Sequence, residues 1–180
     1  MHNRRIVTGH TPSGKSVFLA DSSAPRTGVF KNVPGFAAAL VWETAGDVRV
    51  PWSGQDPTPD AKSLLPPQGG TNLLLVTFPP DSVMTSPNFD PAAAGAEYMQ
   101  LLPGLAERFE MDSPGMHTTD TVDYDILIEG EIHLELDDGV MKQLVPGDIV
   151  VQNGTRHAWR NKSDKPATML FVLVSAQRKT

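Results

Sequence analysis

Two histidines near the ends of one β-rich stretch, residues 115–161, are the side chains in this sequence best suited to chemistry. They are His117 and His157, forty positions apart (157 minus 117). Imidazole nitrogens bind metal ions and transfer protons near neutral pH. A small closed β-barrel would bring both side chains together across its interior. We therefore predict that they share a metal ion or a small ligand there.

Short strands separated by turns must position these histidines. Residues 132–136 alternate apolar and polar side chains, which predicts a half-buried strand. Asp138-Gly139 is a strong hairpin signal, and residues 146–148 predict another turn. The continuous apolar run at 168–174 is typical of a strand buried on both faces. The stretch predicts an all-β architecture.

The N-terminal half adds further strands and loops. Short strands are expected at residues 5–8 and 15–19, and a longer one at 71–78, while the Pro- and Gly-rich residues 48–70 predict a surface loop. Residues 9–16 match the phosphate-binding loop pattern letter by letter. That pattern requires a following helix, and none is predicted here, so we interpret it as a hairpin turn.

One convincing helix is expected around residues 90–110. Asp90 is a suitable N-cap, Pro91 suits the first helical position, and apolar residues recur at helical spacing from Met99 to Phe109. The helix either packs against the barrel or covers its mouth as a lid. In the second case Met99 lines the substrate pocket.

Composition excludes several classes of function. The 180 residues suit one domain with a real core. A net charge of −6 without a basic block disfavours nucleic-acid binding. The sequence has no cysteine, so disulfides and thiolate metal sites are excluded. Neither a signal peptide nor a membrane span is evident, so we expect a soluble, cytoplasmic protein without a membrane partner.

The C-terminal third resembles the cupin family of small jelly-roll barrels. The family's first motif has a His-x-His pair, a Glu and a Gly, and its second has a Gly, a His and an Asn. The matching positions here are His117, Thr119, Asp123 and Gly130, then Gly147, His157 and Asn161. The resemblance implies a structural role for Asn161.

The same resemblance implies the overall fold: an all-β jelly-roll (cupin) barrel with extra N-terminal strands and a helical insertion around residues 90–110. Residues 1–180 would be a single cupin domain. It would comprise strands and loops in 1–80, the insertion in 90–112 and the core motifs in 113–176. Because the family is often dimeric, we also expect a homodimer.

Two departures from the family motif bear on the metal. By resemblance, the family holds it with three histidines and a glutamate, whereas this sequence has Thr119 for one histidine and Asp123 for the glutamate. We predict that His117, Asp123 and His157 bind a divalent ion. Two imidazoles and a carboxylate suit Fe(II), and also Mn, Ni or Zn. Alternatively, the site has decayed and the histidines are interior residues without a metal.

Several neighbours of the predicted ligands are candidates for the reaction. Thr119 and Tyr124 are predicted to be catalytic, Thr119 because its hydroxyl can hydrogen-bond a bound water or substrate. Trp159 shares strand parity with His157 and is predicted to line the pocket, although core packing is an alternative for both aromatic residues. His133 alternates with apolar residues on a polar face, which predicts an exposed side chain.

The predicted function is a metal-dependent enzyme acting on a small organic metabolite. Its chemistry is either that of a lyase (decarboxylation or dehydration) or that of an Fe(II) dioxygenase. The alternative is a cupin that binds a small molecule without metal and without catalysis.

Overall fold

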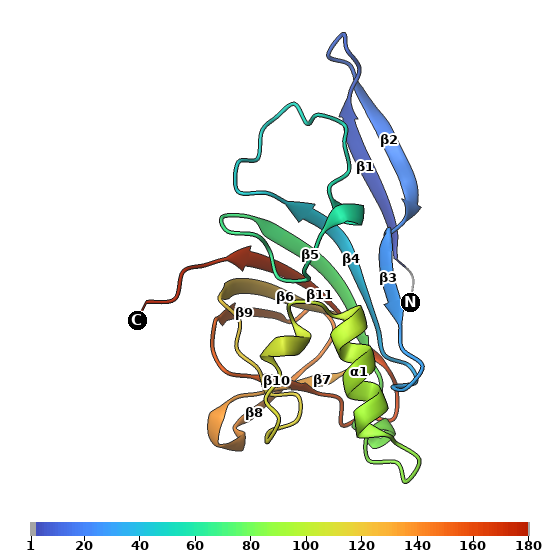
Figure 1. The fold of residues 1–180 in the computed structure, drawn as a ribbon, viewed down its shortest axis with the longest axis vertical. Helices are drawn as coiled ribbons and strands as arrows, with labels where there is room; N and C mark the ends of the chain where they lie inside the picture. Colours follow the sequence, from blue (N-terminus) through green and yellow to red (C-terminus); the bar gives the residue numbers. More distant parts are fainter. Residues whose placement is uncertain (1–2, 180) are drawn as a thin grey trace.

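The computed structural model describes residues 3–179 and consists mainly of strands (Figure 1). A six-stranded sheet has the order β3-β4-β5-β11-β6-β9, a three-stranded sheet has the order β10-β7-β8, and β1 pairs with β2 alone. The bounds are β1 Arg4–His10, β2 Ser16–Ser23, β3 Arg26–Val29, β4 Ala37–Thr44, β5 Thr71–Phe78, β6 Thr121–Glu129, β7 Ile132–Glu135, β8 Met141–Leu144, β9 Ile149–Asn153, β10 Ala158–Arg160 and β11 Ala167–Ser175. The predicted all-β jelly-roll class is confirmed.

The core lies between the two larger sheets. Alternate residues of β5, β6 and β11 point inward and are buried, and they meet Ile132 and Leu144 of the smaller sheet. β11 was expected to be buried on both faces. Its residues instead alternate between buried and half-buried, because only one face of the sheet is covered by the core. This alternation decides which side chains of β6 enter the barrel.

The helix α1, Pro91–Leu101, begins as predicted. The Asp90 carboxylate accepts hydrogen bonds from the amides of Ala92 and Ala93 at 2.9 and 3.0 Å. Glu97 accepts two more, from the amides of Lys31 and Asn32. These bonds tie α1 to the turn after β3, so α1 lies alongside the barrel (Figure 1).

Residues 3–179 also contain short 3₁₀ helices, namely η1 Thr58–Asp60, η2 Asp81–Val83, η3 Ala106–Arg108 and η4 Asp137–Gly139. At η4, Asp138 and Gly139 both have positive φ, 59° and 69°. This is the conformation that an Asp-Gly hairpin turn requires, so the turn expected between β7 and β8 is confirmed. None of the helices among the described residues has the length and apolar character needed to cross a bilayer.

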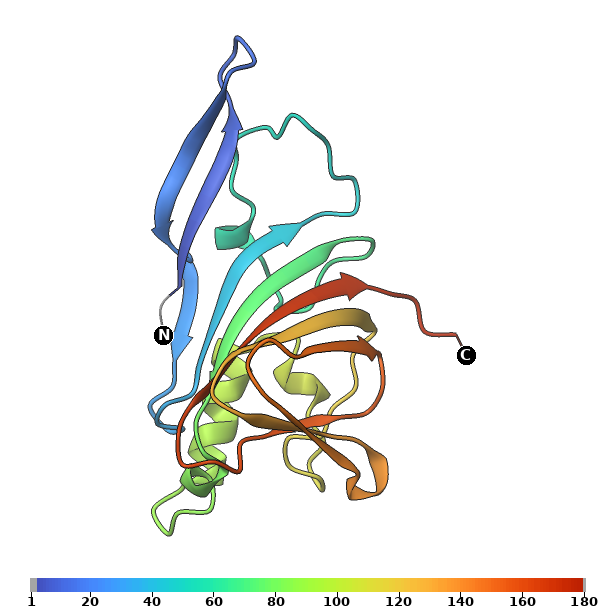
Figure 2. The same ribbon diagram turned by 180° about the vertical axis from the view of Figure 1, so that it is seen from behind.

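The first two strands form a hairpin that extends beyond the rest of the molecule (Figure 2). β1 and β2 are antiparallel, and the turn between them contains Thr11 and Gly14, whose backbones are hydrogen-bonded. A strand rather than a helix follows this turn. The interpretation of residues 9–16 as a hairpin turn is therefore confirmed.

Asn161 holds the chain just after β10. Its side-chain amide donates to the carbonyls of Phe78 and Lys165, at 3.0 and 2.8 Å, and its amide oxygen accepts from the backbone of Ser163 at 3.1 Å. The residue is almost completely buried. These bonds support the structural role that the family resemblance implied.

Replacing Asn161 by alanine should lower the free energy of unfolding by about 2–4 kcal/mol, because the Phe78 and Lys165 carbonyls lose the buried amide that donates to both. Urea denaturation followed by circular dichroism measures the change. The exposed Asn153→Ala serves as the control and should change stability by less than about 0.5 kcal/mol. Equal effects of the two substitutions would contradict the role assigned to Asn161.

Candidate functional site

His117 and His157 are brought together by the backbone itself. The two residues exchange both amide hydrogen bonds, His117 N to His157 O at 2.9 Å and His157 N to His117 O at 3.0 Å. Side chains of residues directly opposite in an antiparallel pair lie on the same face. The two imidazole ring centroids are accordingly 4.2 Å apart. Both residues are buried.

The orientation of each imidazole is set by one hydrogen bond. Nδ1 of His117 lies 3.0 Å from the Gly115 carbonyl, and Nδ1 of His157 lies 3.0 Å from the Thr155 carbonyl. Because a carbonyl oxygen only accepts, each Nδ1 carries the proton. Each Nε2 therefore keeps its lone pair, which is how metal-binding histidines are commonly oriented.

Burial keeps both imidazoles neutral. Burial, together with the neighbouring His117, lowers the pKa of His157 to about 4. Burial also lowers the pKa of His117, against an opposing contribution from its bond to the Gly115 carbonyl. At neutral pH both rings are uncharged and present basic nitrogens.

Aromatic rings flank the histidine pair. The Phe109 ring centroid lies 5.0 Å from that of His117, and the Trp159 centroid lies 5.9 Å from that of His157. Trp159 also contacts Phe171 of β11, with the ring centroids 5.7 Å apart. Trp159 thus lies beside His157, on the side that strand parity predicted.

Two arginines close to His157 in the chain bind the segment that precedes His117. Arg156 pairs with both carboxylate oxygens of Glu110, each at 2.7 Å, and Arg160 donates to the Pro114 carbonyl at 2.8 Å. Both arginine side chains are about two-thirds or more covered, because Arg156 is paired with Glu110 and Arg160 with Glu135.

A row of polar side chains lies on the inner face of the large sheet. Asp123 and Asp125 on β6 are buried, as is Gln152 on β9, directly opposite Asp123. One oxygen of each aspartate and the Gln152 amide nitrogen have no hydrogen-bond partner. Burial raises the pKa of Asp123 to about 6, and burial together with Asp123 raises the pKa of Asp125 to about 8.

Asp125 and Gln152 are candidate site residues that the sequence analysis missed. Asp125 lies two positions after Asp123 and so shares its face of the strand, which was a usable signal. Gln152 carried no comparable signal, because its place opposite Asp123 depends on the register between β6 and β9. Buried polar atoms without partners are uncommon and concentrate where function requires them.

The other predicted residues occupy different surroundings. Thr119 is buried, and its hydroxyl lies 2.8 Å from that of Thr121. Tyr124 is 46% exposed, because it alternates with the inward-facing Asp123 and Asp125, and Met99 is 51% exposed on α1. The structure does not bring Tyr124 or Met99 to the histidine pair. His133 is half-buried rather than exposed.

The donor set fits a metal ion only in part. The two imidazoles have the required orientation, and Asp123 has an unpartnered oxygen. Within residues 3–179, however, no three His, Cys, Asp or Glu side chains form a group that could hold a metal ion. His117, Asp123 and His157 therefore stay a prediction as a three-ligand set.

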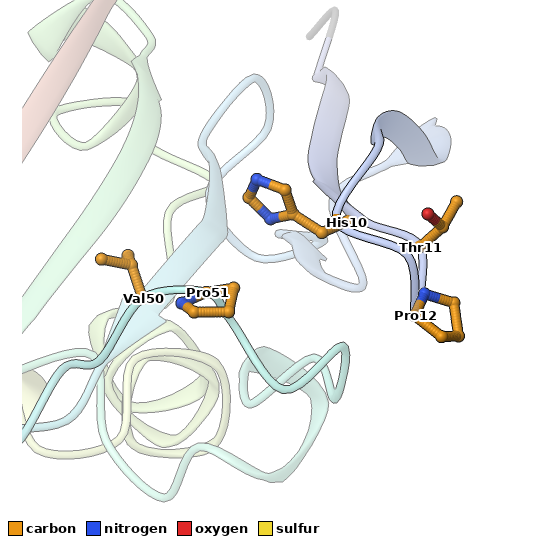
Figure 3. Close-up of a pocket in the computed structure, with 6 residues that line it drawn as sticks. His10, Thr11, Pro12, Val50 and Pro51 are labelled. Atoms are coloured by element: carbon orange, nitrogen blue, oxygen red, sulfur yellow. The ribbon is translucent and has the colours of Figure 1, made fainter.

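Two cavities lie outside the barrel, where the β1–β2 hairpin faces the loop at 45–57. One, of about 450 Å³, is lined by His10, Thr11 and Pro12 on the hairpin and by Val50 and Pro51 on the loop (Figure 3). The second, of about 800 Å³, lies between β1, the end of β4 and the same loop. Neither includes the histidine pair.

Comparison with known proteins identifies residues 110–173 as matching the family model "Cupin domain". Phomopsin biosynthesis cluster protein C' of Diaporthe leptostromiformis is 44% identical over 63 residues, covering 34% of this chain and 33% of that protein. Oryzines biosynthesis cluster protein J of Aspergillus oryzae is 35% identical over 104 residues, covering 57% of this chain and 50% of that protein.

A third similar protein aligns over nearly the whole chain. The cupin-domain-containing oxidoreductase virC of Hypocrea virens is 26% identical over 179 residues, covering 96% of this chain and 76% of that protein. The two biosynthesis-cluster proteins are matched over only a third to a half of their own lengths.

The free energy of unfolding of Asp125→Asn, relative to that of the unmodified protein, should increase as pH rises from about 4 to 8. The folded-state pKa of Asp125, about 8, lies above its ordinary value of 3.8. Between these two pH values the folded protein keeps the carboxyl proton, whereas the unfolded chain loses it. The stability linked to that proton is present below pH 4 and is lost as pH rises through 8, at about 1.4 kcal/mol per pKa unit of difference.

Chemical denaturation at several pH values measures this difference between the variant and the unmodified protein. Asp164→Asn, at an exposed position, is the control and should change stability by less than about 0.5 kcal/mol at neutral pH. A difference that does not vary with pH for Asp125→Asn would show that the carboxyl is not held in a buried, uncharged state.

Proposed function

Because this chain belongs to the cupin superfamily, we propose that it is an oxidoreductase that acts on a small organic molecule at the histidine pair of the barrel. The observation that carries the proposal is the pairing of two buried, neutral imidazoles at 4.2 Å, each anchored through Nδ1. Two basic nitrogens held this way are suited to binding an ion or to moving protons of a substrate.

The reaction class draws on the similar proteins. Two of them, from Hypocrea virens and Neurospora crassa, carry the name cupin-domain-containing oxidoreductase and align over 96% and 94% of this chain at 26% identity. Of the two classes predicted from the sequence, these names support oxidation over lyase chemistry. The substrate would be a small metabolite that reaches the barrel interior.

The more specific proposal is that a divalent metal ion takes part. His117 and His157 would hold it through Nε2, with Asp123 as the candidate carboxylate ligand, and Fe, Mn, Ni or Zn would suit these donors. When bound, such an ion supplies redox or Lewis-acid chemistry. The Nδ1 bonds to Gly115 and Thr155 support this role, because they fix each ring and its tautomer.

The remaining side chains would bind and orient the substrate. Phe109 and Trp159 form apolar walls on either side of the histidines and would exclude water from the reacting group. Asp123 and Gln152 offer an acceptor and a donor that have no partner within the protein. A substrate hydroxyl would satisfy both, because it donates to the carboxylate and accepts from the amide.

A second candidate function is small-molecule binding without metal or catalysis. The donor set favours it, since the described residues contain no three-ligand group. The histidines and the row of polar side chains (Asp123, Asp125 and Gln152) would then bind the ligand by hydrogen bonds alone. Metal analysis separates the two candidates.

The metal-dependent proposal predicts about one bound ion per chain, and loss of binding in His117→Ala and His157→Ala. An ion at a hundred times its Kd should stabilise the unmodified protein by about 2.7 kcal/mol. Elemental analysis and thermal unfolding with added Fe(II), Mn(II), Ni(II) or Zn(II) measure both effects. His133→Ala, outside the site, is the control and should bind normally.

Oxidation is tested separately with a panel of small alcohols, phenols and organic acids, assayed in air and without oxygen. An oxidoreductase that uses dioxygen forms product only in air, whereas a lyase is active in both. A protein that binds none of the four metals, and whose stability does not respond to them, would favour the second candidate.

A further inference from the structure

The larger of the two cavities outside the barrel is lined by two of the chain's three tryptophans. Its volume is about 800 Å³, and small-molecule sites typically measure about 300–1,000 Å³. Trp42 at the end of β4 and Trp52 in the loop at 45–57 have ring centroids 5.3 Å apart, with the ring planes inclined by 72°. We call this hollow the tryptophan cavity.

A shift in strand register turns Trp42 toward this cavity. By strand parity alone, Trp42 would face the barrel core together with Leu40, two positions before it. The register between β4 and β5 shifts between these two residues and places Trp42 opposite Leu73 instead. Leu73 also lines the cavity, and opposite residues of an antiparallel pair project from the same face. Such shifts re-aim a side chain and are frequent beside functional sites.

One polar side chain of the cavity has a nitrogen without a partner. Arg5 lines the cavity, and its side chain is only 9% exposed. The guanidinium pairs with Asp56, donates to the Val41 carbonyl at 3.0 Å and lies 5.6 Å from the centroid of the Trp42 ring. Its Nε has no hydrogen-bond partner among the described residues. Buried donors without a partner are uncommon in folded proteins, which indicates that Arg5 is kept there for an acceptor from outside the chain.

The charges around the cavity favour a neutral ligand. Arg5 is already paired with Asp56, and the other charged side chains that line the cavity are Arg49, Glu43 and Asp47. Two arginines are thus balanced by three carboxylates, so an anion would find no surplus positive charge. A neutral carbonyl oxygen can accept from the guanidinium without adding negative charge.

We propose that the tryptophan cavity is a second small-molecule site, separate from the histidine pair, for a neutral planar aromatic molecule with a carbonyl oxygen. Because the two indole planes are inclined, a flat ligand lies against one ring with its edge toward the other. The Arg5 guanidinium donates to the ligand's oxygen. The site belongs to the N-terminal half of the chain, outside residues 110–173 that match the cupin family model.

The neighbouring cavity of about 450 Å³ lacks these features (Figure 3). Of the described residues, no tryptophan, arginine or carboxylate lines it. The aromatic faces and the hydrogen-bond donor are therefore found together in the larger cavity alone of these two.

The three tryptophans make the test direct, because each gives one indole N–H signal in a nitrogen-15 NMR spectrum. Trp159, beside His157 in the barrel, is the internal control. Titration with 1-indanone, a neutral planar ketone, should shift the signals of Trp42 and Trp52 at concentrations that leave the Trp159 signal unchanged. Replacing each tryptophan by phenylalanine in turn assigns the three signals.

Indane, which has the same rings without the oxygen, tests the hydrogen bond. Arg5→Lys keeps the charge but lacks the planar guanidinium, so it should weaken the binding of 1-indanone by about tenfold or more and that of indane by less than about twofold. Arg4→Lys, at the neighbouring exposed arginine, is the matched control and should leave both affinities unchanged.

Two results with the unmodified protein would overturn the proposal without any variant. One is a shift confined to the Trp159 signal, or no shift of the Trp42 and Trp52 signals up to the solubility limit of the ketone. The other is a change of these two signals with protein concentration alone, which would show that a second copy of the chain fills the cavity. Equal weakening of 1-indanone and indane by Arg5→Lys would overturn the hydrogen bond assigned to Arg5.

Discussion

The bridge between His117 and His157 is the interaction on which the rest of the site depends. The segment before His117 belongs to no long strand, so its position relies on two backbone bonds to His157 and on the arginine contacts to Glu110 and Pro114. Because residues paired in this way project from the same face, the backbone alone brings the imidazoles together. Their tautomers are then set by two local carbonyls, without any longer-range contact.

Polar groups in the barrel interior lower the stability of the folded protein. Each buried polar atom without a partner costs about 1–3 kcal/mol, and the inner row carries three: on Asp123, Asp125 and Gln152. Apolar residues at these positions would satisfy the fold at lower cost. Local rules of folding are broken mainly where function requires it. The row and the histidine pair together make the interior chemically distinct from the purely apolar core around Leu127 and Met169.

Local signals explain what could be predicted from the sequence. Asp90 caps α1, Asp138-Gly139 turns the chain between β7 and β8, and the apolar run at 71–78 forms β5 between its turn residues. Strand parity correctly related Trp159 to His157. It was not applied to Tyr124, which faces outward because its neighbour Asp123 faces inward. The place of Gln152 and the projection of the β1–β2 hairpin depend on register and tertiary packing, for which one sequence contains no local signal.

The central claim is that His117 and His157 are both neutral and protonated on Nδ1, with Nε2 free to bind. Nitrogen-15 NMR of the imidazole rings at pH 7 tests it most directly, since the chemical shifts of the two ring nitrogens distinguish the tautomers and the charged form. We predict the Nδ1–H form for both rings, unchanged down to pH 5 for His157, whose pKa is lowered to about 4. A charged ring at pH 7, or the Nε2–H form in either residue, would contradict the account.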